Sequence, residues 1–319
     1  MFRIWIDEPL LDSVLPMLDG VAEIVGPSAS AEDLATCEAA LVPGARWDAV
    51  RMDAAPCLRV LSRIGVGYDN IDVAAATARG ILVCYTPQAP TISTAEHAVA
   101  LLFAVAKTIC IGDRDARAGR WHAQFWTLKG MELDGRTLGL VGAGRIGARV
   151  ALVARAVGMR VLVFDPYLDA MRAAELGLER SDSLEALLRE SDAVSLHAPA
   201  TPETRHMIDA VRLAQMKPGA LLINTARGSL VDEDALVAAL RSGHLGGAGL
   251  DVFDREPIAP DHPLLQLDNV VLTDHIASHT WAGHHRLYET AVHQALQALR
   301  GERPEGLLNA QVLGKADGR

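Results

Sequence analysis

The sequence has little that would place the protein in a membrane, in a secretory pathway or on nucleic acid. Its longest apolar run, residues 98–106, is far too short to span a bilayer. The N-terminal stretch MFRIWIDEPL lacks the basic-then-apolar pattern of a signal peptide. The formal net charge is -10 and no long basic run occurs, which argues against nucleic acid or an anionic membrane as the main partner. We therefore expect a soluble, cytoplasmic protein whose partner is a small molecule.

Cysteine is also scarce, with 4 residues in the chain and no C-x-x-C pair. We expect these thiols to be small buried groups in a reducing compartment. Histidines lie four apart at His275 and His279, and His284, His285 and His293 follow. Two histidines at that spacing on a helix can share a metal ion, but no acidic or cysteine partner is well spaced, so we expect no metal.

Aromatic residues make up only 4% of the chain, yet Trp121, Phe125 and Trp126 occur close together in a polar, basic segment, 112–131. Aromatic side chains and arginine are enriched at subunit interfaces, so this segment is a candidate subunit contact. Packing against the chain's own linker would explain the same concentration equally well.

What the sequence does contain is a nucleotide-binding pattern. An apolar run, 138–141, leads into Gly142, Gly144 and Gly147 in G-x-G-x-x-G spacing, and apolar residues then recur at helical steps. The first glycine permits a tight turn, the second lets the backbone approach a pyrophosphate, and the third lets helix and strand pack closely. The N-terminus of the helix offers free N–H groups to the phosphates.

The second strand of this unit, 161–164, ends at Asp165. A carboxylate at that position can accept hydrogen bonds from the adenosine ribose hydroxyls, whereas a 2'-phosphate would be repelled. The expected cofactor is therefore NAD(H) and not NADP(H).

Strands alternate with helices along the chain, which predicts parallel sheets. In the first third we expect strands at 3–6, 21–25, 39–42, 58–62 and 81–84, with helices at 8–18, 31–37 and 72–79. Six further strands are expected at 138–141, 161–164, 193–196, 220–223, 248–252 and 270–272, with helices at 148–157, 184–191 and 233–242. Long helices are expected at 91–107 and 281–301. The fold class is thus α/β, with doubly wound parallel sheets.

Ligands of such sheets bind beyond the carboxyl ends of the strands. Arg227, Glu256 and His275 each follow a different strand end, so we expect them at one edge. Histidine can exchange a proton near neutral pH, a carboxylate can hold the imidazole and favour its protonated form, and an arginine can grip a substrate carboxylate. This set suits hydride transfer between nicotinamide and a 2-hydroxy or 2-keto acid. Taken singly, each residue could equally be structural.

A second glycine-containing loop, residues 63–72, follows a strand of the first third. Glycines two apart let backbone N–H groups turn toward a ligand, although a plain strand-to-helix turn has the same composition. Arg63 could reach a substrate phosphate or a second carboxylate, or it could be structural.

Several motifs together resemble the D-isomer-specific 2-hydroxyacid dehydrogenases, the family of phosphoglycerate dehydrogenase, hydroxypyruvate reductase and D-lactate dehydrogenase. The matching stretches are GVGYDNID (65–72), STAEHAVALL (93–102), LGLVGAGRIG (138–147), HAPATPETRHMI (197–208), MKPGALLINTARGSLVDEDAL (216–236), GLDVFDREP (249–257) and HIAS (275–278). The resemblance implies a catalytic trio of Arg227, Glu256 and His275. It implies that the backbone amides of Val66 and Gly67 help to hold the substrate carboxylate. Besides the three glycines and Asp165, the implied cofactor contacts are Arg145, Ile146, His197, Ala198, Pro199, Thr204, Thr225, Ala226, Asp251 and Ala277.

The family fold consists of two Rossmann-like domains, one of them discontinuous. By this resemblance we expect a substrate-binding domain from residues 1–98 plus 286–319, and an NAD-binding domain from residues 99–285. We expect a homodimer whose contact includes a segment at about 108–132. The chain ends soon after its last helix, without the C-terminal regulatory domain of many phosphoglycerate dehydrogenases, so we expect no serine feedback.

One position departs from the family pattern, because Asp274 stands where a proline commonly precedes the catalytic histidine. A second carboxylate beside His275 could favour the protonated imidazole, or it could point to solvent. An alternative function also stays open, since NAD-sensing corepressors use the same fold and can retain the same three residues. The sequence does not choose among phosphoglycerate-, hydroxypyruvate- and glyoxylate-like substrates, and D-stereospecificity rests on the resemblance.

Overall fold

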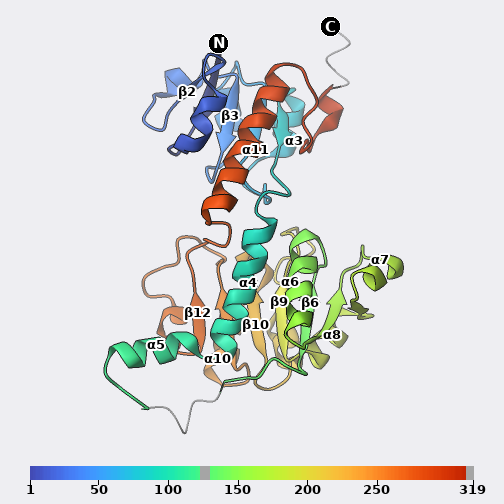
Figure 1. The fold of residues 1–319 in the computed structure, drawn as a ribbon. Helices are drawn as coiled ribbons and strands as arrows, with labels where there is room; N and C mark the ends of the chain where they lie inside the picture. The colour runs from blue at the N-terminus through green and yellow to red at the C-terminus, as the bar shows by residue number, and fades with distance from the viewer. Residues whose placement is uncertain (123–129, 314–319) are drawn as a thin grey trace. The chain divides into compact units, whose positions relative to one another are not determined.

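The computed structural model describes residues 1–122 and 130–313 (Figure 1). The chain divides into two compact units, the first formed by Met1–Pro90 with His279–Arg319 and the second by Thr91–Ser278. We expected the chain to change domains at residues 98 and 286, and both changes come several residues earlier. The reason at the first boundary is that helix α4 (Thr91–Ala106) packs along its length against the core of the second unit.

The first unit is built on a parallel sheet of five strands in the order β2-β1-β3-β4-β5. Its strands are β1 (Phe2–Ile6), β2 (Ala22–Val25), β3 (Ala39–Val42), β4 (Val60–Arg63) and β5 (Leu82–Cys84). Alternate side chains of each strand enter different cores, because successive residues of a strand point to opposite faces. Ile4 and Ile6 pack toward α11 (Trp281–Leu299), and Trp5 packs on the other face.

The helices of the first unit differ in length from the sequence expectation. The helix expected at 8–18 was wrong in type, since only a 3₁₀ helix, η1 (Asp12–Met17), forms there and Pro16 lies inside it. Helix α1 (Ala31–Leu34) is a single turn, and α2 (Ala49–Asp53) was not foreseen. Helix α3 (Val73–Ala78) begins after Asp72, whose side chain accepts the Ala75 N–H as expected of an N-cap.

The second unit is built on a parallel sheet of seven strands in the order β12-β11-β10-β9-β6-β7-β8. The strands are β6 (Thr137–Val141), β7 (Arg160–Phe164), β8 (Glu179–Arg180), β9 (Ala193–Leu196), β10 (Leu221–Asn224), β11 (Gly247–Leu250) and β12 (Val270–Leu272). All six expected strands are present, and the α/β class with two parallel sheets is confirmed. Strand β8 was missed because its two residues are exposed and give no apolar run.

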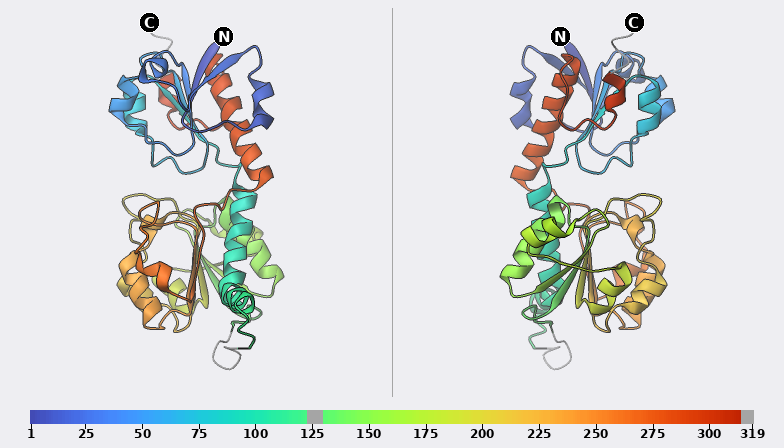
Figure 2. Two further views of the ribbon diagram at one scale, coloured as in Figure 1. Left: turned by 90° about the vertical axis from the view of Figure 1, so that its left-hand side faces the viewer. Right: turned by 90° about the vertical axis from the view of Figure 1, so that its right-hand side faces the viewer.

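Helices cover both faces of this sheet (Figures 1 and 2). They are α5 (Ile109–Arg117), α6 (Arg145–Ala156), α7 (Ala170–Glu175), α8 (Leu184–Glu190), α9 (Ala210–Gln215) and α10 (Glu233–Arg241), together with α4 and two 3₁₀ turns, η2 (Gly228–Leu230) and η3 (Pro263–Gln266). The short helices α7 and α9 had not been expected.

Three further expectations concern the cysteines, membrane-spanning helices and the aromatic segment. All four cysteines are unpaired, but only Cys37 and Cys84 are buried, whereas Cys57 and Cys110 are exposed. Within residues 1–122 and 130–313, no helix is by itself long and apolar enough to cross a bilayer; α4 and α5 meet that test only as a pair, bent by 64°. In the aromatic segment Trp121 is 77% exposed, while Phe125 and Trp126 lie outside the described residues.

Candidate active site

The glycine loop lies between β6 and α6 in the second unit, at the carboxyl edge of the sheet. Gly142 has a φ of 95°, and a Cβ there would come within 2.8 Å of the His197 carbonyl oxygen. A Cβ on Gly147 would come within 2.3 Å of the Gly142 carbonyl oxygen, so α6 can begin this close to the loop only with glycine. A Cβ on Gly144, by contrast, would meet no atom within 4 Å. The outer side of the loop is therefore open to a ligand.

Asp165 ends β7 beside this loop, as the sequence predicted. Its Oδ2 atom accepts the Ala143 N–H at 2.9 Å and its Oδ1 atom accepts the Tyr167 N–H at 2.9 Å. The carboxylate is thereby fixed at the rim of the glycine loop, where it would repel a 2'-phosphate.

Two buried polar atoms at the same edge have no hydrogen-bond partner among the described residues, namely Thr225 Oγ1 and His197 Nδ1. The other ring nitrogen of His197 lies 2.9 Å from Ser195 Oγ, and burial lowers the pKa of this histidine to about 4. Buried polar groups normally have hydrogen-bond partners, so two unsatisfied atoms at the carboxyl edge of the sheet indicate a position for a ligand. Together with the open loop, they fit a dinucleotide.

Other expected cofactor contacts lie around this edge. Arg145 is exposed at the start of α6, and Ile146 follows it. Thr204 donates its hydroxyl to the Pro199 carbonyl at 2.7 Å, which closes the loop after β9. Ala277 is buried and its N–H donates to Asp251 Oδ2 at 2.9 Å.

Arg227 stands in the turn after β10, and a close backbone contact places that turn. A Cβ on Gly228 would lie 1.8 Å from the Phe253 carbonyl carbon, so only glycine lets the two loops touch. Buried Asn224 fixes the turn by donating to the Arg227 carbonyl at 2.8 Å and accepting the Ala226 N–H at 3.0 Å. The contact brings the guanidinium close enough to Glu256 for its charge to favour the ionised carboxylate.

His275 and Glu256 form the central pair of the edge. His275 Nδ1 lies 2.7 Å from Glu256 Oε2, and the other oxygen of Glu256 accepts the Phe253 N–H at 2.9 Å. Burial opposes ionisation of Glu256, but the hydrogen bonds from His275 and Phe253 outweigh it and hold the pKa of the carboxyl below its usual value. An ionised Glu256 makes Nδ1 the protonated nitrogen of the imidazole and leaves Nε2 to serve a substrate.

In the glycine-containing loop of the first unit, residues 63–72, the Arg63 side chain bonds to the backbone of its own unit. The guanidinium of Arg63 donates to the carbonyl oxygens of Gly67 at 2.7 Å and Val42 at 3.0 Å, and also to those of Pro43 and Ile64. These bonds fix the path of the 64–67 loop. They favour the structural interpretation of Arg63 over a role in binding a phosphate, while Val66 remains 37% exposed.

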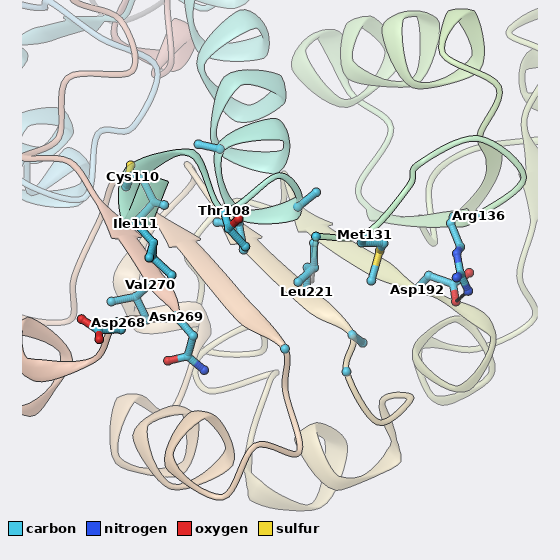
Figure 3. Close-up of a pocket in the computed structure, with 18 of the residues that line it drawn as sticks. Thr108, Cys110, Ile111, Met131, Arg136, Asp192, Leu221, Asp268, Asn269 and Val270 are labelled. Atoms are coloured by element: carbon cyan, nitrogen blue, oxygen red, sulfur yellow. Dashed lines mark ion pairs between the residues drawn. The ribbon is translucent and has the colours of Figure 1, made fainter. Parts of the chain in front are cut away.

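A pocket with a volume of about 440 Å³ occurs elsewhere on the second unit (Figure 3). It is lined by the residues that begin β10 and β12, by Asp192 before β9, and by Thr108, Ile111 and Met131. It therefore lies at the amino-terminal edge of the sheet, opposite the edge that carries Arg227, Glu256 and His275. Ligands of doubly wound sheets bind at the carboxyl edge, so we do not assign the active site to this pocket.

Comparison with known proteins agrees with this geometry. Residues 99–277 match the family model described as the NAD binding domain of D-isomer specific 2-hydroxyacid dehydrogenases. The chain belongs to this family. It is 48% identical over 268 residues to a glyoxylate reductase of Korarchaeum cryptofilum, covering 83% of this chain and 80% of that one. It is 38% identical over 315 residues to a D-3-phosphoglycerate dehydrogenase of Methanocaldococcus jannaschii, covering 97% of this chain and 60% of the relative. The crystal structure of the TT0316 protein of Thermus thermophilus superposes with a TM-score of 0.89 at 41% identity, over 96% of this chain and 100% of that one.

As a member of the 2-hydroxyacid dehydrogenase family, the protein is an NAD-dependent oxidoreductase acting on 2-hydroxy and 2-keto acids. The structure adds residues to the edge that the sequence did not single out for the site. Thr273 and His97 both contact Asp251, and the Phe253 N–H holds Glu256. The only sequence signal for His97 was its place in the STAEHAVALL motif, which gave it no partner.

Proposed function

We propose that this dehydrogenase reduces a small 2-keto acid of the glyoxylate or hydroxypyruvate kind to the 2-hydroxy acid, the D isomer where the product is chiral, with Arg227, Glu256 and His275 as its catalytic residues. The observation that carries the proposal is the 2.7 Å contact between His275 and Glu256, with the Arg227 charge close by, at the carboxyl edge beside the glycine loop. A bound NADH would supply the hydride.

Each of the three side chains has a distinct task in this proposal. His275 gives the proton to the forming hydroxyl from Nε2, because Nδ1 is held by Glu256. Glu256 favours the protonated imidazole and fixes the ring plane. Arg227 binds the substrate carboxylate through its planar fork of donors and polarises the carbonyl.

The residues that would hold NADH are those of the open edge. The α6 N–H groups after Gly144 would bind the pyrophosphate, and Asp165 would accept the ribose hydroxyls. Thr225 Oγ1 and His197 Nδ1 would gain the partners that they lack among the described residues.

One observation favours a small keto acid over a phosphorylated one. Arg63 is the cation nearest in sequence to Val66 and Gly67, and its guanidinium donates to backbone carbonyl oxygens.

The test is NADH oxidation by the purified protein with glyoxylate, hydroxypyruvate, phosphohydroxypyruvate, pyruvate and longer 2-keto acids. We expect turnover of glyoxylate or hydroxypyruvate, and a loss of about 10²–10⁴-fold in kcat for His275→Gln, the usual contribution of a general acid. His293→Gln, on the exposed side of α11, is the matched control and should keep full activity. Preferred turnover of phosphohydroxypyruvate would overturn the substrate class. Tight NADH binding without turnover of any acid would instead favour the NAD-sensing alternative.

We propose in addition that the protein is a cytoplasmic homodimer whose contact includes the segment at 108–132. The support is two exposed apolar side chains in this segment, since Ile109 is 53% exposed and Trp121 is 77% exposed. Light scattering at micromolar concentration should give twice the mass of the 34.1 kDa chain. A monomer in that experiment would exclude this contact.

A further inference from the structure

Helix α4 packs directly against strand β11 in the second unit. A Cβ on Gly247 would lie 2.7 Å from Val105 Cγ1, and a Cβ on Gly249 would lie 2.9 Å from Leu101 Cβ. Four residues of a helix and two residues of a strand span nearly the same length, roughly 6 Å and 6.6 Å. One more step of this register pairs His97 with Asp251.

The side chains at that third step are in contact. His97 Nε2 lies 3.4 Å from Asp251 Oδ1 and 3.0 Å from Thr273 Oγ1, and Thr273 Oγ1 donates to Asp251 Oδ1 at 2.6 Å. Asp251 is fully buried, and the His97 side chain is 20% exposed. Burial opposes ionisation of Asp251, but the hydrogen bonds from His97 and Thr273 and from two backbone N–H groups outweigh it, and the pKa of the carboxyl is lowered.

Asp251 holds the backbone turn at residues 275–277, which carries His275. Its carboxylate accepts the N–H groups of Ile276 and Ala277, each at 2.9 Å, and its carbonyl oxygen accepts the His275 N–H at 2.9 Å. His275 has a φ of 59°, a left-handed conformation that is uncommon outside glycine and that its surroundings must hold in place. The turn and the histidine orientation therefore depend on Asp251.

We propose that His97 is a positioning residue, which sets the orientation of His275 against Glu256 by holding Asp251 and Thr273. The proposal rests on the function proposed above for His275. Among the described residues no hydrogen bond or ion pair joins His97 to His275; His97 acts through the buried carboxylate and the turn at 275–277. The glycines of β11 are part of the same arrangement, because they let α4 approach closely enough for the contact.

The charged groups around His275 determine in which direction its titration midpoint should move when His97 is replaced. Glu256 contacts the ring and favours its protonated form, Asp274 is the adjacent exposed carboxylate, and Arg227 lies near Glu256 and opposes protonation. Asp251 accepts the backbone N–H groups of the turn, and His97 contacts Asp251. If His97 is removed, the turn relaxes, the contact with Glu256 weakens, and protonated His275 loses stabilisation. Its titration midpoint should fall.

The experiment compares His97→Leu, His97→Gln and Leu101→Ala. Leucine removes the donor but keeps much of the volume, and glutamine keeps a donor. Leu101→Ala loosens the same face of α4 one helical turn away without touching Asp251. In each protein the midpoint of His275 is measured twice, from the pH profile of kcat/KM for reduction and from the imidazole NMR signal of the free protein, assigned with His275→Gln.

For His97→Leu we expect a midpoint about half a pH unit lower and a kcat about tenfold lower, because small displacements of a catalytic group are costly. His97→Gln should be intermediate, and Leu101→Ala should leave the midpoint unchanged. An unchanged midpoint in both His97 variants would overturn the proposal, as would an equal shift in Leu101→Ala. If wild type reduces none of the acids, the proposed function fails, yet the NMR midpoint still decides the role of His97.

Discussion

His197 lies beneath the glycine loop and should make the stability of the second unit depend on pH. The residue as a whole is partly exposed, but its Nδ1 atom is buried and has no hydrogen-bond partner among the described residues. Burial lowers the pKa of His197 from 6.5 to about 4. The folded protein therefore keeps this imidazole neutral over a pH range in which the unfolded chain is already protonated.

The sign and size of the effect follow from that difference. Above pH 6.5 the imidazole is neutral in both the folded and the unfolded state, so it does not change the free energy of unfolding. Below that value His197 becomes protonated in the unfolded chain but stays neutral in the folded protein. The free energy of unfolding therefore falls by about 1.4 kcal/mol per pH unit until the pKa of the folded state is reached. At pH 5 the loss should be about 2 kcal/mol relative to pH 7.5.

The assay is urea unfolding followed by circular dichroism at both pH values, for wild type and His197→Gln. Glutamine can still bond Ser195 but does not titrate, so wild type should lose about 2 kcal/mol more than the variant on acidification. His293→Gln, at an exposed position, should behave as wild type. A native His197 imidazole that titrates near its ordinary value by NMR would refute the reasoning. So would a difference between wild type and variant that is the same at both pH values.

Three further outcomes are expected at the carboxyl edge. Gly147→Ala should weaken NADH binding at least tenfold by fluorescence titration, because its Cβ would meet backbone at Gly142 and shift the loop; unchanged affinity would show that the loop tolerates the methyl group. Glu256→Gln should lower kcat/KM for reduction by about 10²-fold and move its pH midpoint toward acid, since the protonated imidazole loses its carboxylate; an unmoved midpoint would contradict the role of Glu256. Asp274→Pro should make reduction less tolerant of high pH, because the exposed carboxylate beside His275 is removed, and coincident pH profiles would dismiss that role.

The strands were predictable wherever the chain gives an apolar run. Residues 193–196 and 270–272 form strands with the expected bounds. For residues 193–196 the reason is that a parallel strand buried on both faces needs apolar side chains on both. Strand β8 was not predicted because its two exposed residues form no apolar run, and helix α9 was not predicted because its six residues are too few to show a helical period. The helix expected at 8–18 fails because Pro16 cannot donate a backbone hydrogen bond.

The site shows the same division. Arg227, Glu256 and His275 could be placed at one edge from the strand order alone, because parallel strands deliver their carboxyl ends to the same side. The engagement of Arg63 by backbone carbonyl oxygens could not be foreseen, since its partners depend on how the 64–67 loop folds back toward β3.

The sequence by itself determined the fold class, the glycine loop and its acidic partner, because local periodicity and spacing carry that information. Its family motifs singled out the candidate catalytic residues. Only the tertiary structure decided which side chains act on one another. His97 and Asp251 are distant in sequence, and they meet because two glycines let α4 rest directly on β11. Such a contact depends on packing between separate elements, which no local pattern in the chain records.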